Sequence, residues 1–68
     1  MDDKDIRLTV QSCLKKGDLT LLYLWITFRA NGGVACRTTM YAFVHGLQAL
    51  SNNDRLVFGS VVQDLKDN

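Results

Sequence analysis

The sequence predicts an all-α fold, a compact bundle of about four short helices that forms one domain over residues 1–68. Apolar residues recur at three- and four-residue intervals over residues 5–16, 34–50 and 52–66, and this spacing places them on one face of a helix. The 68-residue chain contains no proline and is 47% hydrophobic, so its helices are free of proline kinks and it can fill a core. No internal repeat or linker divides it.

The first helix is predicted over residues 5–16. Lys15 and Lys16 suit the negative C-terminal end of the helix dipole, and Gly17 can adopt the left-handed conformation that ends a helix. Asp18 then serves as the N-cap of the next element. The apolar stripe of this first helix consists of Ile6, Val10, Cys13 and Leu14.

The next segment, residues 19–30, is apolar on every side and rich in aromatic and β-branched residues. Periodicity alone does not separate a helix from a buried strand in such a run. The Asn31-Gly32 pair is a hairpin signal, so the alternative is an α+β fold with a hairpin over residues 19–40. We interpret the segment as a helix because residues 34–50, which would supply the second strand, do not alternate between apolar and polar.

A helix without a polar face belongs either at the centre of the fold or in the seam of a dimer. With 47% hydrophobic residues, a monomer of this length would have to leave several large apolar side chains in water, and large exposed apolar patches mark interfaces. We therefore expect a homodimer. Its predicted seam consists of Leu21, Leu24, Trp25 and Phe28.

The strongest helical pattern covers residues 34–50, with Gly46 inside the predicted helix at a cost of about 1 kcal/mol relative to alanine. Its apolar stripe consists of Cys36, Met40, Phe43, Val44, Leu47 and Leu50. The last helix is predicted over residues 52–66, where Ser51 and Asp54 have the spacing of a capping box. Its apolar face consists of Phe58, Val61, Val62 and Leu65.

The chain carries few of the residues that catalysis or metal binding requires. His45 is the only histidine, and with two separated cysteines it forms no metal-ligand cluster and no nucleophile–base pair that the spacing supports. We expect no enzymatic activity, no metal and no cofactor. Cys13 and Cys36 each lie on an apolar stripe, which favours small buried side chains, and whether they ever pair stays open.

The N-terminal segment Met1–Asp5 is acidic where a secretory signal needs cations. The longest apolar run, between Asp18 and Arg29, is about half of the ~20 residues that a membrane span requires. The sequence therefore predicts a reduced, cytoplasmic protein without membrane contact.

One polar strip on the predicted third helix is a candidate contact surface. It consists of Arg37, Tyr41, His45 and Gln48. Arginine and tyrosine dominate the energetic centres of protein interfaces, so we predict that this strip binds a partner protein. The alternative is an ordinary solvated face.

Residues 33–43, which read G-V-A-C-R-T-T-M-Y-A-F, resemble the turn and recognition helix of helix-turn-helix regulators, often G-V-S-x-x-T-x-Y before an apolar residue. The resemblance implies that Arg37, Thr38 and Tyr41 face the major groove or phosphates of DNA, with Arg29 nearby. The sequence departs from the family at Arg29, where a small alanine is usual. Its net charge of +1 also offers few cations to phosphates.

These observations predict a small non-catalytic helical interaction module, a homodimer that binds an unidentified protein. Adaptors, inhibitors and accessory regulators of the kind carried by phages and plasmids have this general character. The alternative is a dimeric helix-turn-helix regulator that binds DNA through the helix at residues 34–50.

Overall fold

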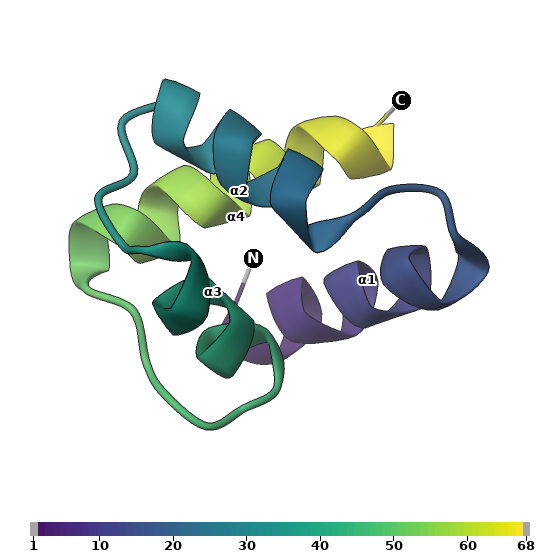
Figure 1. Ribbon diagram of the computed structural model, residues 1–68, viewed down its shortest axis with the longest axis horizontal. Helices are drawn as coiled ribbons and strands as arrows, with labels where there is room; N and C mark the ends of the chain where they lie inside the picture. Colours follow the sequence, from purple (N-terminus) through teal and green to yellow (C-terminus); the bar gives the residue numbers. More distant parts are fainter. Residues whose placement is uncertain (1, 68) are drawn as a thin grey trace.

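Four α-helices make up the computed structural model, which describes residues 2–67 (Figure 1). They are α1 (Asp3–Lys16), α2 (Leu21–Ala30), α3 (Arg37–Val44) and α4 (Asn52–Asp67). α1 and α2 each pack against both α3 and α4. Residues 2–67 contain no strand, so the predicted all-α bundle is confirmed and the alternative hairpin over residues 19–40 is wrong.

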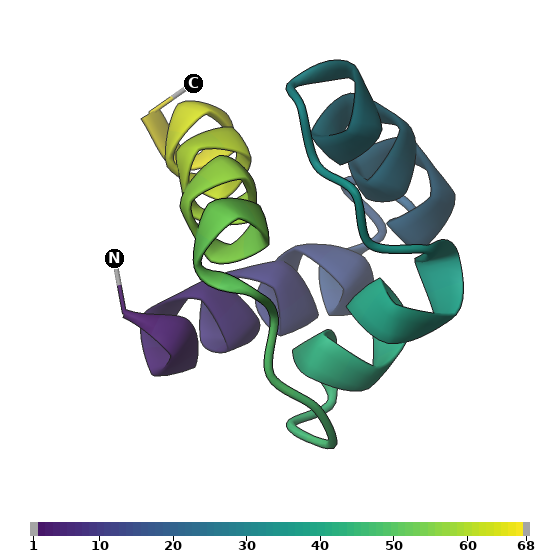
Figure 2. The same cartoon turned by 90° about the vertical axis from the view of Figure 1, so that its left-hand side faces the viewer.

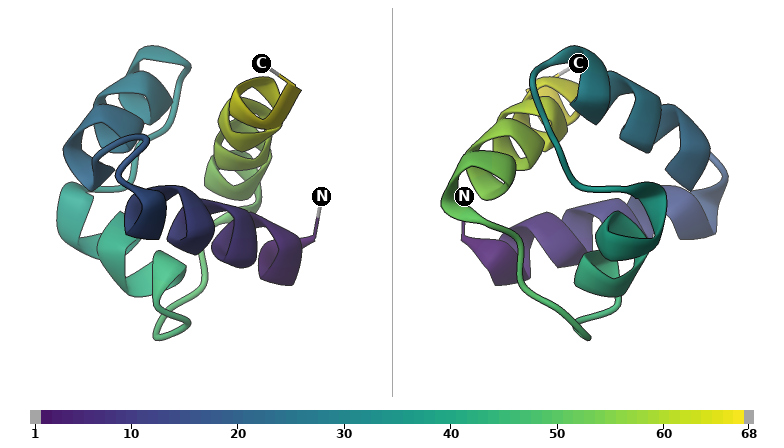
Figure 3. Two further views of the ribbon diagram at one scale, coloured as in Figure 1. Left: turned by 90° about the vertical axis from the view of Figure 1, so that its right-hand side faces the viewer. Right: turned by 60° about the vertical axis from the view of Figure 1, so that its left-hand side comes forward.

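α2 and α4 lie side by side on the same side of α1, which runs across their base (Figures 2 and 3). α3 lies below α2 and also packs on α1. The connection from α2 to α3, residues 31–36, runs from the top of α2 down to the start of α3 (Figure 3, right). Each helix therefore meets two others, and the core lies between them.

The first two helices begin where short polar side chains cap them. The Asp2 carboxylate accepts a hydrogen bond from the Asp5 amide at 2.8 Å, so α1 begins at Asp3, two residues before the predicted start. Gly17 ends α1 in the left-handed conformation, as predicted. The predicted cap at Asp18 is wrong, because the Thr20 hydroxyl accepts from the Tyr23 amide at 3.1 Å and α2 begins at Leu21.

α3 is much shorter than the predicted helix over residues 34–50. The backbone is still extended at Cys36, so the helix begins at Arg37. Gly46, at φ +75°, follows the end of the helix instead of lying inside it. Amide hydrogen bonds from Gly46 to Phe43 and from Leu47 to Ala42 form a Schellman motif. Because the helix has ended, Leu47 does not continue the apolar stripe and is 78% exposed.

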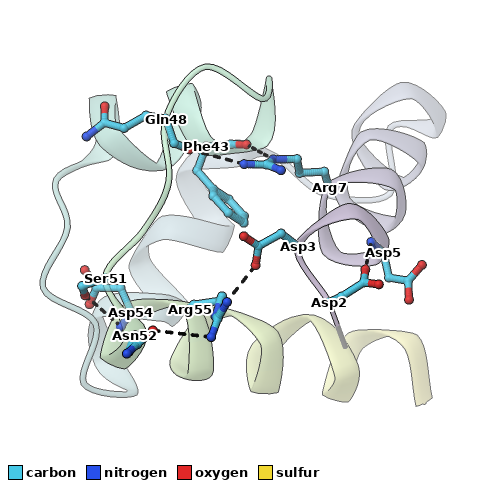
Figure 4. A network of polar contacts seen from close by, with 10 residues as sticks. All are labelled: Asp2, Asp3, Asp5, Arg7, Phe43, Gln48, Ser51, Asn52, Asp54 and Arg55. Atoms are coloured by element: carbon cyan, nitrogen blue, oxygen red, sulfur yellow. Dashed lines mark hydrogen bonds and ion pairs between the residues drawn. The ribbon is translucent and has the colours of Figure 1, made fainter.

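Side chains of α1 satisfy the last carbonyl groups of α3. Arg7 Nε donates to the Phe43 carbonyl at 2.7 Å, and its guanidinium lies over the Phe43 ring at 4.4 Å (Figure 4). Gln11 Nε2 donates to the Val44 carbonyl, also at 2.7 Å. Helix-terminal carbonyls need such partners when they are removed from water, so α1 fixes the point at which α3 stops.

Three phenylalanine rings form the centre of the core. Phe58 of α4 meets Phe28 of α2 and Phe43 of α3 edge to face, with ring centroids 5.8 Å apart in both pairs. α1 closes the fourth side with Ile6 and Val10. The other buried apolar residues are Leu24, Met40, Val44, Val61 and Val62.

The bundle encloses this core without help from a second chain. Its accessible surface is 4370 Å², against about 4300 Å² expected for a folded monomeric protein of 7.7 kDa. As the sequence predicts for a single chain, several large apolar side chains nevertheless lie in solvent, among them Leu22, Tyr23 and Ile26.

Asp54 fastens the α2–α3 connection to the first turn of α4. The residue is 6% exposed, and its carboxylate accepts a hydrogen bond from the Val34 amide at 2.9 Å. Its own amide donates to the Ser51 hydroxyl at 3.2 Å (Figure 4). The serine half of the predicted capping box thus forms, while the carboxylate serves the neighbouring connection.

The same connection passes directly over the ring of Phe28. Gly33 is buried there, and a Cβ atom at this position would overlap the Phe28 ring. Trp25 Nε1 donates to the Ala35 carbonyl at 3.1 Å, and Arg29 donates to the Val34 carbonyl at 3.0 Å. These contacts set the position and direction in which α3 starts.

We predict that Asp54→Ala lowers the free energy of unfolding by about 1–3 kcal/mol, because it leaves the Val34 amide without an acceptor in a partly buried position. Asp54→Asn, which keeps an acceptor oxygen, should lose less. Urea unfolding followed by circular dichroism measures both. The control is Asp64→Ala on the exposed side of α4, and equal losses in Asp54→Ala and Asp64→Ala would contradict the fastening role.

Candidate functional site

Four of the eight large apolar side chains that lie exposed within residues 2–67 belong to α2 and α3, and the other four, on α1, in the connections and on α4, are Leu8, Val34, Leu47 and Leu56. Leu22, Tyr23 and Ile26 are 46%, 55% and 54% exposed, and we call these three the outer face of α2. Tyr41 on α3 is 52% exposed. The opposite side of α2 carries Leu24, which is fully buried. The helix is therefore apolar on both sides, with one side in the core and the other in solvent.

A shallow groove of about 370 Å³ lies between these two helices, and we call it the α2–α3 groove. Leu21 and Leu22 line it from α2, and Arg37, Thr38 and Tyr41 line it from α3. Leu22 belongs both to the groove and to the outer face of α2, so the two surfaces are continuous. The combination offers an apolar lining with a cation, two hydroxyl groups and an aromatic ring beside it.

The predicted contact strip is only partly continuous. Arg37 and Tyr41 lie on α3, with His45 at its C-terminal end, and all three are exposed. The rings of Tyr41 and His45 lie 4.4 Å apart between centroids. Gln48 lies in the connection beyond the turn that ends α3 and does not extend the helical strip, because the helix ends at Val44.

The predicted dimer seam is placed differently by the structure. Leu24 and Phe28 are fully buried within a single chain and so present no surface to a second copy. Leu21 and Trp25 are half-buried against the same core. The sequence correctly grouped these four on one side of a helix, but that side faces the chain's own α3 and α4. The outer face of α2, which the sequence analysis missed, is the side that remains free.

Arg37 is the only charged side chain among the residues that line the groove. Residues 19–53 contain Arg29 and Arg37 but neither aspartate nor glutamate. Arg29 is occupied within the fold, since it donates to the Val34 carbonyl and lies 5.8 Å from the Trp25 ring centroid. Arg37 makes no ion pair or side-chain hydrogen bond within residues 2–67.

The first turn of α3 adds a positive partial charge beside Arg37. Asp2, Thr20 and Ser51 accept amide hydrogen bonds at the starts of α1, α2 and α4. At the start of α3, Cys36 makes no such bond. The positive end of a helix dipole that no side chain neutralises favours anionic groups nearby.

Cys36 departs from its prediction as a buried thiol, since it is exposed and forms the N-cap residue of α3. It lies outside the helix, so the apolar stripe begins only at Met40. Its Sγ lies 3.3 Å from the Thr39 hydroxyl oxygen. Hydrogen bonding from the Thr39 side chain, with further bonding from the Thr39 backbone, lowers the pKa of the Cys36 thiol below its usual value. Cys13 is half-buried, and both cysteines are free.

The helix-turn-helix resemblance is not matched by the geometry of the connection. Residues 31–36 separate α2 from α3, whereas the helix-turn-helix motif uses a turn of about three or four residues. Arg37, Thr38 and Tyr41 do lie together on the first turns of α3, as the resemblance implies. Arg29, the fourth residue expected to contact DNA, is bound to the connection.

Within residues 2–67, no three histidine, cysteine or acidic side chains come together in an arrangement that could hold a metal ion. None of the helices in this part of the chain combines the length and the apolar character that a membrane crossing requires. Comparison of the chain with protein-family models, with curated proteins and with solved structures found no match.

The position of Cys36 predicts a difference in thiol reactivity. Cys36 should be alkylated by iodoacetamide faster than Cys13, because it is more exposed and its thiolate is favoured. Thr39→Val removes the hydroxyl and should shift the pH midpoint of Cys36 alkylation upward. Mass spectrometry of each cysteine-containing peptide, as a function of pH, measures both effects. An unchanged midpoint in Thr39→Val would show that the hydroxyl does not stabilise the thiolate.

Proposed function

We propose that this chain is a small non-catalytic interaction module that binds another protein through the α2–α3 groove and the adjoining outer face of α2. The observation that carries the proposal is the continuity of these two surfaces through Leu22. Together they present large apolar side chains to solvent beside an unpaired arginine. Exposed apolar clusters of this kind mark sites of macromolecular contact.

The residues that are available suit such a contact. Tyr23, Tyr41 and Arg37 are exposed, and tyrosine and arginine are among the side chains that contribute most to interface affinity. The contacts of Asp54, Trp25 and Arg29 hold the connection that orients α3. A surface fixed in this way loses little conformational entropy when it binds. The module would act sterically, as an adaptor, inhibitor or accessory regulator.

A homodimer, which the sequence also predicts, would compete with the partner protein for the same surface. A homodimer would have to use Leu22, Tyr23 and Ile26, since Leu24 and Phe28 are enclosed in the core. The two free thiols favour a reducing compartment, so we propose the cytoplasm as its location.

DNA binding is the second candidate, and the exposed cluster of Arg37, Thr38 and Tyr41 on α3 favours it. Phosphate neutralisation supplies most non-specific DNA affinity. Only Arg37 and Arg29 carry a permanent positive charge between residues 19 and 53, and Arg29 is bound within the fold. This scarcity of cations places protein binding ahead of DNA binding.

The function is tested by comparing two charged variants of exposed leucines. Leu22→Asp places a charge in the proposed surface, whereas Leu56→Asp places the same charge on α4, where the leucine is 71% exposed. We predict that proteins retained from a lysate of the source organism by the wild-type chain are retained by Leu56→Asp and lost with Leu22→Asp. Circular dichroism establishes that both variants are folded.

Retention that is equal for the two variants would contradict the proposed surface. A gel-shift assay with a duplex DNA at low salt provides the other arm. Retarded DNA that is released by salt and by Arg37→Ala would support the second candidate in place of the first.

A further inference from the structure

The α2–α3 groove has a chemistry that specifies its partner more closely, provided that the proposed function is correct. We infer that the groove takes an acidic amphipathic segment of the partner protein. An apolar side chain of that segment enters the groove, and its carboxylates face Arg37 and the first turn of α3. The inference rests on the shape of the apolar lining and on the sign of the charge around it.

The apolar lining calls for a segment with more than one anchor. Leu21 and Leu22 form the α2 wall, and Tyr41 stands at the α3 side. Tyr23 and Ile26 continue the apolar surface along α2 outside the groove. Amphipathic helices that dock in grooves place apolar side chains three, four and seven residues apart. Such a segment covers the groove and the outer face of α2 together.

The charge around the groove specifies an acidic segment. Residues 19–53 provide no carboxylate, and the Asp54 carboxylate that follows them is buried and bonded to the Val34 amide. Arg37 lines the groove without an ion-pair partner in the described part of the chain. The start of α3, which lacks a side-chain cap, adds a positive partial charge on the same side.

A second copy of this chain fits the groove poorly. In a two-fold symmetric contact the same surface meets itself, so both copies would bring Arg37 and neither would bring a carboxylate from residues 19–53. The acidic residues of the chain lie elsewhere, on α1, after Gly17 and on α4. A copy presenting one of those surfaces would make a head-to-tail contact, which leads to open assemblies. A different protein with its own acidic residues brings carboxylates to Arg37 and forms a closed complex.

The experiment selects partners by chemistry without assuming an identity. A random library of linear 16-residue peptides is selected against the folded full-length chain, and enriched peptides are synthesised. Their binding is then located on isotope-labelled protein by amide chemical shifts. We expect enriched peptides to be acidic and amphipathic, and to shift the amides of Leu21, Leu22, Arg37, Thr38 and Tyr41.

Two charge-reversal variants sharpen the test. Arg37→Glu should weaken the enriched peptides at least about tenfold, because it opposes like charges across the contact. Lys66→Glu makes the same charge change on the exposed side of α4 and should leave affinity unchanged within about twofold. Replacing the acidic residues of an enriched peptide with lysines should restore its binding to Arg37→Glu.

The possible outcomes separate this inference from the proposed function. Neutral or basic peptides that bind at the groove with the same affinity for the wild type and for Arg37→Glu would overturn the acidic partner. The groove would remain a protein-binding surface. Peptides that shift only amides of α1 and α4 would overturn both. Failure to enrich any peptide, or displacement of bound peptides by a DNA duplex at low salt, would also count against the inference.

Discussion

Phe58 contacts both Phe28 and Phe43, and the positions of three helices depend on this pair of edge-to-face contacts. Phe28 packs against Phe58, and the connection that leaves α2 passes over the other side of this packed cluster, on the Phe28 ring. Only a residue without a side chain fits at that point, and Gly33 is buried there. The central ring cluster thus determines the course of the connection, and the connection determines where α3 begins.

The binding surface follows from that arrangement. When the Leu24 side of α2 is committed to the core, its opposite side, with Leu22 and Ile26, is left in solvent. α3 then starts beside it and adds Arg37 and Tyr41 to form the groove. Two polar contacts hold this geometry. The Asp54 carboxylate accepts a hydrogen bond from the Val34 amide, and Arg7 of α1 donates to the Phe43 carbonyl at the end of α3 (Figure 4). The surface is therefore a consequence of core packing, and partly buried hydrogen bonds fix the segments beside it.

The four helices could be predicted from the sequence because their apolar spacing and most of their stop signals are local. The ends of α3 could not, since a glycine such as Gly46 is compatible with a helix interior until the packing of α1 supplies caps for the preceding carbonyls. Cys36 leaves the apolar stripe because the backbone there is still extended and α3 begins only at Arg37. On α2 the apolar stripe was recognised, but periodicity carries no information about which stripe of an all-apolar helix faces the core. The candidate groove joins helices separated by a connection, so only Arg37, Thr38 and Tyr41 on one wall and Leu21 on the other were singled out beforehand.

The central claim is that one chain encloses its own core and leaves the outer face of α2 free. Solution NMR with a soluble nitroxide tests it most directly, because the nitroxide broadens methyl signals that it can approach. At tens of micromolar protein, the account predicts strong broadening for the methyl groups of Leu22 and Ile26 and almost none for Leu24. Equal protection of all three would mean that another surface covers α2, and equal broadening would mean that Leu24 is not in the core. Either result would contradict the account.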